Sequence, residues 1–244
     1  MLSKINTLLA SAAITNIKEF KTTLYTRATP GLGTTFTLPA GITEGSFGLL
    51  LVSAVKGLTT DTPIVLGTPT GFTLIAKFQG NVGNGRGSSQ GLFYKYMTAA
   101  DSSTTISTIF ADSLADESES VFIEVIQNAT TRGFDALTNI TGASSSAVAT
   151  LTDVPSTISA QSPFFILTCA TDGGGGGAAA GTLTGGMQAY DTSQNVLNNT
   201  VRVVTTLWKY DNIMIKDLPS TEDAIYSASG TGYVSSGVYV IWLR

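Results

Sequence analysis

A glycine- and serine-rich stretch is the first candidate for a catalytic motif. Gly87-Ser88-Ser89-Gln90-Gly91 spells G-x-S-x-G, the pattern of a nucleophile elbow, in which the serine attacks a carbonyl carbon. That elbow needs a strand–turn–helix context and a histidine base, and the chain contains no histidine. A loop that precedes a strand is the better interpretation, so we predict that this serine is not catalytic.

Carboxylates gather in a second stretch, which holds Asp112, Asp116, Glu117 and Glu119. Calcium favours such oxygen-rich loops, but this spacing fits no EF-hand. Acidic loops are usually only solvated, so we assign no metal site and leave calcium binding by residues 112–119 as an open alternative.

Glu124 is a third candidate, because it interrupts the otherwise apolar run Val121–Ile126. Glycosidases use two carboxylates whose positions can be distant in sequence, and a buried glutamate could be one of them. An outward-facing side chain on an alternating strand is the commoner arrangement. A hydrolase of this kind predicts that Glu124→Gln abolishes turnover, but the sequence supports no catalytic, cofactor-binding or metal-binding residue.

Aromatic residues in strand-like segments offer a surface on which sugar rings could stack. Within strands, such side chains more often pack in the core or pair across strands, which is what we expect here. The residues concerned are Tyr94, Tyr96, Trp208, Tyr210, Tyr239 and Trp242.

Composition excludes several classes of function. Charged residues make up 12% of the 244 residues, and the net charge is −4, so the chain lacks the basic patch of a nucleic-acid-binding protein. The absence of histidine removes histidine-ligated zinc and histidine pH switches. One cysteine, Cys169, allows no disulfide within a chain, and no apolar run is long enough for a membrane helix.

The elements that would position these residues are β-strands, and Gly91–Gln127 sets their pattern. Its alternating aromatic and β-branched residues predict strands at 92–97, 104–110 and 121–126. The polar links Thr98–Ser103 and Ala111–Ser120 are predicted to be loops. Phe47–Val55 is a continuous apolar run, typical of a central strand with both faces buried.

Further strands are predicted along the whole chain, joined by polar or glycine-rich loops. The predicted loops are 59–70, Gln79–Gln90 and Asp172–Gly186, and residues 128–160 are weakly patterned, with one short strand at 148–151. The other predicted strands are 15–29, 33–39, 72–78, 163–170, 187–191, 201–210, 224–229 and 238–243.

These strands predict an all-β protein, an antiparallel β-sandwich of jelly-roll type with a short N-terminal arm or helix. Residues 1–13 form the arm, and residues 14–244 form one domain. The order of strands in 34–127 is echoed in 160–244, most clearly by Phe93-Tyr94-Lys95-Tyr96 and Leu207-Trp208-Lys209-Tyr210. The echo has two interpretations, a pseudo-repeat of two halves or only the alternation of strands that any sandwich contains, and in both cases we expect the halves to pair into one sandwich.

A loose family resemblance rests on a series of motifs in fixed order. They are Leu38-Pro39-Ala40-Gly41, the apolar strand 48–55, Pro69-Thr70-Gly71-Phe72-Thr73-Leu74-Ile75, Leu92-Phe93-Tyr94-Lys95 and the closing strand 238–243. In this order the chain resembles the jelly-roll-like structural proteins of tailed bacteriophages. Phe72 stands where that family usually has tryptophan, and Gly45-Ser46-Phe47 replaces its usual Gly-Asp. The resemblance implies a fold and an assembly role, and it carries over no catalytic residue.

We therefore predict a non-enzymatic virion structural protein without cofactor, most specifically a decoration or cement protein on the outside of a phage head. Its partners would be the major capsid protein or other virion proteins, and it would form a homo-oligomer, for which we predict a trimer. Contacts with nucleic acid or membrane are not expected. The alternative is a tail or fibre component with a carbohydrate-binding or receptor-binding role.

Overall fold

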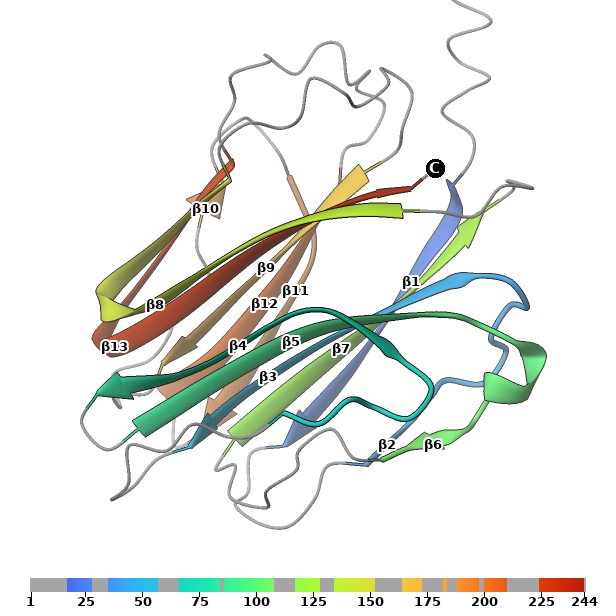
Figure 1. Ribbon diagram of the computed structural model, residues 1–244, viewed down its shortest axis with the longest axis horizontal. Coiled ribbons are helices and arrows are strands. Elements are labelled where there is room, and N and C mark those ends of the chain that lie inside the picture. Colours follow the sequence, from blue (N-terminus) through green and yellow to red (C-terminus); the bar gives the residue numbers. More distant parts are fainter. Residues whose placement is uncertain are drawn as a thin grey trace, which may run out of the picture.

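Strands dominate the computed structural model of the chain (Figure 1). The structure describes residues 17–27, 35–56, 66–83, 86–107, 117–127, 134–151, 164–172, 182–183, 188–197, 200–209 and 224–243. Side chains are described mainly in residues 35–54, 66–78, 89–107 and 120–126. The predicted arm, residues 1–13, lies outside the described residues and stays a prediction.

The first sheet is antiparallel and has the strand order β1-β7-β3-β5-β4. Its central strand, β3, is the predicted apolar run. The strands are β1 (Ile17–Arg27), β3 (Phe47–Lys56), β4 (Thr73–Gly83), β5 (Arg86–Tyr96) and β7 (Glu117–Gln127). A separate pair, β2 (Phe36–Thr37) with β6 (Thr105–Ile106), lies outside this sheet.

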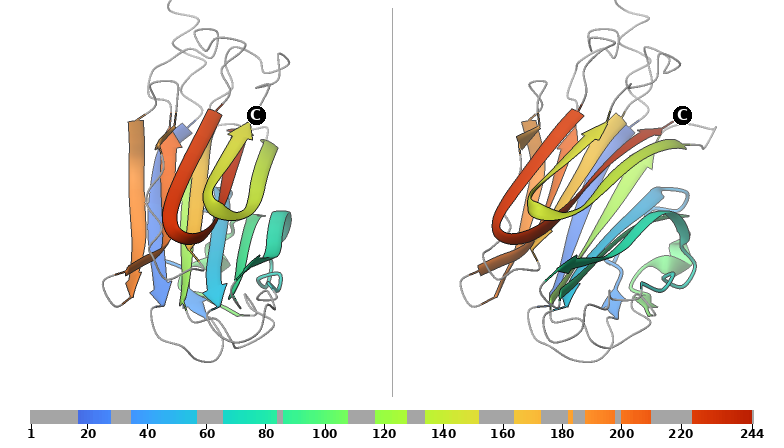
Figure 2. Two further views of the ribbon diagram at one scale, coloured as in Figure 1. Left: turned by 90° about the vertical axis from the view of Figure 1, so that its left-hand side faces the viewer. Right: turned by 60° about the vertical axis from the view of Figure 1, so that its left-hand side comes forward.

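The second sheet is also antiparallel and has the order β10-β13-β9-β12-β11, with β8 paired to β13. The strands are β8 (Phe134–Leu151), β9 (Phe164–Asp172), β10 (Thr182–Leu183), β11 (Gln188–Leu197), β12 (Thr200–Lys209) and β13 (Ala224–Leu243). This sheet packs on the first, with β9 against β3 and β12 against β7 (Figure 2). The prediction of an all-β antiparallel sandwich is therefore confirmed.

Both faces of β3 are buried, which explains why this strand is apolar at most of its positions. Leu50 and Val52 belong to a core cluster with Leu38, Ile42 and Phe72, which come from outside the sheet. Leu49 and Leu51 point the opposite way, towards the second sheet, and are also fully buried. We call the face of Leu50 the outer face, and the segments that cover it (residues 35–46, 66–72 and 97–107) the turn layer.

Glycine-rich and serine-rich segments contain more strand than the sequence predicts. Gln79–Gln90 is not a loop but contains the paired ends of β4 and β5, where Ser89 and Gln90 are fully buried. Pairing with β3 keeps this stretch extended, because Val52–Lys56 bonds to Gly87–Gly91.

Other predicted boundaries are wrong for a similar reason. Strand β8 runs for 18 residues where one short strand was predicted, and β13 joins two predicted strands into one of 20 residues. The predicted loop Ala111–Ser120 gives way to β7 from Glu117 onward, and β10 lies inside the predicted loop Asp172–Gly186. In each case the neighbouring strand supplies hydrogen bonds that weak local propensity does not reveal.

The two sheets repeat one arrangement. In chain order, β3, β4, β5 and β7 form the order β7-β3-β5-β4, and β9, β11, β12 and β13 form β13-β9-β12-β11. The register agrees as well: Gly48 stands opposite both Lys95 and Glu124, and Phe165 stands opposite both Lys209 and Ile241. Both outer pairs also carry a register shift, after Leu74 in one sheet and after Ala189 in the other.

Candidate functional site

A row of directly opposite residues crosses four strands of the first sheet, and three of the four residues are charged. Lys21 on β1 stands opposite Glu124 on β7, which stands opposite Gly48 on β3, which stands opposite Lys95 on β5. Strand pairing places residues in directly opposite positions on the same face. Glu124 and Lys95 therefore lie on the outer face, beneath the turn layer, with Gly48 between them.

Gly48 leaves the room that the turn layer needs above this row. A Cβ at this position would lie 2.6 Å from Met97 Sδ and 3.0 Å from the Phe122 ring. Met97 is 1% exposed, and its backbone exchanges hydrogen bonds with the turn at Gly45 and Ser46. A side chain at position 48 would force the buried side chains of Met97 and Phe122 to shift.

Glu124 is buried and binds the turn Thr43–Ser46. Its Oε1 accepts hydrogen bonds from Thr43 N over 2.7 Å and from Ser46 Oγ over 2.8 Å. Its Oε2 lies 3.9 Å from Lys21 Nζ, at the rim, where the lysine side chain is 41% exposed and the glutamate side chain is 2% exposed. The carboxylate therefore stabilises a turn by accepting its hydrogen bonds. The only sign of this role in the sequence is one charged residue in an apolar strand.

The turn that Glu124 supports has its own reason to form. Ser46 N donates to Thr43 O over 3.1 Å, and Gly45 has φ +80°. A positive φ at the third position is the requirement of a type II turn, which glycine meets without strain. Thr43-Glu44-Gly45-Ser46 therefore enters β3 through a turn whose polar groups meet Glu124.

Asp101 and Lys95 form the second polar cluster of the turn layer. Asp101 Oδ1 accepts a hydrogen bond and salt bridge from Lys95 Nζ, and Oδ2 accepts from Thr98 N over 2.8 Å and Thr98 Oγ1 over 2.9 Å. Burial on its own raises the pKa of Asp101, but the hydrogen bonds from Lys95 and Thr98 outweigh it, so the pKa lies below its ordinary value. Asp101 thereby fixes the short 3-10 helix Ala99–Asp101 against β5.

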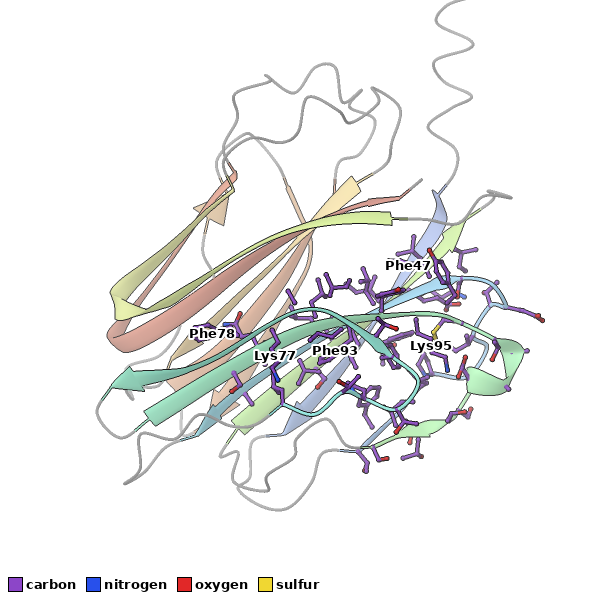
Figure 3. The ribbon with its side chains drawn as sticks, in the orientation of Figure 1. Phe47, Lys77, Phe78, Phe93 and Lys95 are labelled. Atoms are coloured by element: carbon purple, nitrogen blue, oxygen red, sulfur yellow. The ribbon has the colours of Figure 1, made fainter. Side chains whose placement is uncertain are left out.

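Two of the motifs that carry the predicted family resemblance, at 38–41 and at 69–75, lie at this end of the first sheet. Gly71, with φ +81°, sits so close to Lys95 that a Cβ there would be 3.1 Å from Nζ. Pro39 and Gly41 are bonded to the segment that carries Asp101, through Ser103 N to Pro39 O and through Gly41 N to Ser102 Oγ. Figure 3 shows Lys95 at this end and Phe93 further along the same strand. Pro39, Gly41 and Gly71 therefore lie in turns that hold the turn layer together.

The candidate serine is not at a nucleophile elbow. Gly87–Gly91 lies inside β5, paired with β3 on one side and β4 on the other, and Ser89 is fully buried. This extended backbone lacks the strand–turn–helix geometry that exposes a nucleophile. The predicted loop is therefore wrong for this stretch, which is strand and lacks the geometry of an elbow.

The acidic stretch 112–119 is only partly within the described residues. Asp112 and Asp116 lie outside them, whereas Glu117 and Glu119 stand in β7 opposite Val55 and Ser53. Among residues whose side chains are described, no three His, Cys, Asp or Glu side chains come close enough to hold a metal ion. Calcium binding at 112–119 stays untested.

The aromatic candidates divide in the same way. Tyr94 and Tyr96 are half-buried and pack with Phe47, at ring-centroid distances of 6.0 Å and 5.6 Å, as expected for cross-strand pairs. Trp208 belongs to β12, and Tyr239 and Trp242 belong to β13, but their side chains lie outside the described part. Tyr210 lies outside the described residues.

Two other sequence features can be placed. Cys169 is in β9, within the predicted strand. In the part of the chain that the structure describes, no helix is long and apolar enough to cross a membrane.

Comparisons with known proteins give little further information. No family model matches the chain, and no curated protein matches it. Among solved structures, the chain has a similarity to the major capsid protein P2 from Bacteriophage PM2, with 8% sequence identity and a TM-score of 0.26, over 92% of this chain and 98% of that chain. A similarity at this level carries no argument about fold or function, so both rest on the chain's own geometry.

Proposed function

We propose that this chain is a non-enzymatic structural protein of a bacteriophage virion, most specifically a decoration or cement protein on the outside of the head. The observation that carries the proposal is the turn layer. Its buried carboxylates, Glu124 beneath it and Asp101 within it, are engaged in holding backbone and hydroxyl donors. Groups engaged in this way support a surface and are poorly placed to attack a substrate.

The exposed side of the turn layer has the properties of an assembly surface. Apart from Glu44, the residues of the layer that are described as exposed are threonine, serine, alanine and glycine, so Glu44 is the one charged residue among them. Docking such a surface desolvates few charges, and backbone held by turns loses little freedom on binding. The partners we propose are the major capsid protein or other virion proteins, together with further copies of this chain in a trimer.

The experiment that tests this role is sedimentation velocity on the full chain, on residues 14–244, and on the variant Ala100→Lys. Ala100 is exposed in the turn layer, so a lysine there should leave the fold intact and weaken assembly by adding a charge to the interface. Leu74→Lys is the matched control, because Leu74 is 41% exposed on β4, outside the layer.

We expect a trimer that dissociates when residues 1–13 are removed and that is weakened by Ala100→Lys but not by Leu74→Lys. A monomer that is indifferent to both the deletion and Ala100→Lys would contradict the assembly role. Turnover of any glycoside that is lost in Glu124→Gln would contradict the non-enzymatic part.

A tail or fibre component that binds a carbohydrate or receptor is the second candidate. It is favoured by the half-buried pair Tyr94 and Tyr96, whose rings lie 6.1 Å apart in an edge-on arrangement. Aromatic faces with partial exposure can stack on sugar rings. Glycan-dependent quenching of tyrosine and tryptophan fluorescence that is lost in Tyr94→Ala would favour this role over the first.

A further inference from the structure

Two carboxylates hold neighbouring segments of the turn layer. Glu124 on β7 binds Thr43 and Ser46 in the segment 38–46, and Asp101 in the segment 97–104 binds Lys95 on β5 as well as Thr98 of its own segment. The two segments come from different parts of the chain, one before β3 and the other after β5. Each carboxylate is therefore a separate attachment of the layer to the first sheet.

Hydrogen bonds join the two segments along their whole length. Gly45 N donates to Met97 O over 2.8 Å, and Met97 N donates to Ser46 O over 2.9 Å. At the other end, Leu38 N donates to Thr104 O over 2.9 Å, and Gly41 N donates to Ser102 Oγ over 2.8 Å. Neither segment can leave the sheet without breaking bonds to the other.

We propose that segments 38–46 and 97–104 form one strap that opens as a unit, and that protonation of Asp101 opens it. Protonation removes the negative charge of Asp101 and so weakens its salt bridge with Lys95 Nζ, and a proton on Oδ2, which already accepts from two Thr98 groups, displaces one of them. Loss of the Lys95 salt bridge frees the 3-10 helix Ala99–Asp101 from β5, loss of a Thr98 bond loosens the start of that helix, and the bonds between the segments carry the loosening to 38–46.

The charges around the strap determine how it responds to pH. Lys95 on β5 faces Asp101, Lys21 on β1 faces Glu124, and Glu44 is exposed on the turn of the strap. Because Lys95 and Thr98 favour the charged form of Asp101 and lower its pKa, the strap stays closed at neutral pH and opens in acid, below the ordinary pKa of an aspartate.

Opening would uncover apolar surface. Leu38 and Ile42 of the strap are buried in the core cluster with Phe122 and Met97, and the cluster is closed to solvent while the strap is in place. Acid would therefore make an apolar patch accessible at one end of the sheet. This device does not depend on the proposed virion role and would be present in a protein of any function.

Hydrogen–deuterium exchange of the full chain, read by mass spectrometry on peptides from both segments, tests the strap at neutral pH. In Asp101→Ala, losing a charge-assisted hydrogen-bond acceptor should speed exchange about tenfold or more in 97–104 and equally in 38–46, which Asp101 does not touch. If Asp101→Ala fails to fold, Lys95→Met is the substitute, because it removes one donor but keeps the carboxylate. It should also speed exchange in both segments.

The control is Thr37→Ala, which removes the exposed hydrogen bond of 3.1 Å between Thr37 and Thr105 hydroxyls and should leave both segments protected. Wild-type protein at pH 3 should show the same faster exchange in both segments, after correction for the intrinsic rate, and Asp101→Asn should remove this pH effect. Faster exchange confined to 97–104, or an acid response that survives in Asp101→Asn, would overturn the proposal.

Discussion

Ser46 Oγ donates a hydrogen bond of 2.8 Å to the carboxylate of Glu124, a residue 78 positions further along the chain. Ser46 ends the turn that begins β3, and Glu124 lies on β7, the neighbour of β3 in the sheet. The bond therefore fixes where β3 starts relative to β7. A buried charge that would be costly alone is retained because it meets a backbone N–H and a hydroxyl at the same oxygen.

Replacement of Glu124 separates its roles as acceptor and as charge. Glu124→Ala removes the acceptor of the buried Ser46 hydroxyl and of the part-buried Thr43 N–H, and it should lower the free energy of unfolding by about 3 kcal/mol. Glu124→Gln keeps an oxygen at the same place and should cost about 1 kcal/mol. Urea unfolding measures both, with the exposed Glu44→Gln as the matched control in the same turn. Equal losses for glutamine and alanine would show that the charge itself is needed.

Asp101 should contribute stability that depends on pH. Its folded pKa lies below its ordinary value of 3.8, so the folded state favours the charged form. This contribution is fully present above the unfolded pKa and is lost as pH falls through the folded pKa. Unfolding free energies measured from pH 7 down to pH 2 should therefore fall more steeply below about pH 4 in the wild type than in Asp101→Asn. Identical slopes in the two proteins would contradict the role assigned to Asp101.

Two glycines should respond to alanine for different reasons. Gly48→Ala places a methyl group against Met97 and Phe122, and overpacking of this kind should cost about 1–3 kcal/mol. Gly41 has φ +76° but open space around its Cβ position, so Gly41→Ala should cost about 1 kcal/mol from backbone strain alone. Thermal unfolding compares the two, and Gly41→Asn should recover part of the loss, because asparagine tolerates this backbone region. Recovery at Gly48 by the additional change Met97→Ala would identify crowding as the cause there.

The sequence predicts the strands whose side chains are large and apolar. Phe47–Val55 is apolar at every position but Gly48 and Ser53, and the structure covers both of its faces. Residues 134–151 contain few large apolar residues and little alternation, yet pairing with β13 holds them extended. Strand formation there depends on a partner strand whose paired residues lie from 73 (Leu151 with Ala224) to 109 (Phe134 with Leu243) positions away, which no local pattern can show.

The candidate site was predictable only in part. Glu124 stands out in its apolar strand, but its partners Thr43 and Ser46 lie in a turn that looks like any polar loop. Asp101 gave no signal at all, because one aspartate in a polar link is usually solvated, and its burial depends on Lys95 and the packing of the turn layer. Sequence spacing shows which residues share a strand face, but not which loop folds over that face.

Because both faces of β3 are buried, we expect truncation of either of two neighbouring residues in this strand to be costly, unlike in a sheet with one solvated face. In such a sheet, adjacent residues alternate between core and solvent, so only one of two neighbours is costly to truncate. Leu50 is 0% exposed beneath the turn layer and Leu51 is 1% exposed towards the second sheet. Leu50→Ala and Leu51→Ala should therefore each lower the unfolding free energy by about 2–5 kcal/mol in urea titrations. Leu74→Ala, at a position 41% exposed, is the control and should cost less than about 1 kcal/mol. If only one of the two substitutions in β3 is costly, then one of the two covering layers does not exclude water from the first sheet.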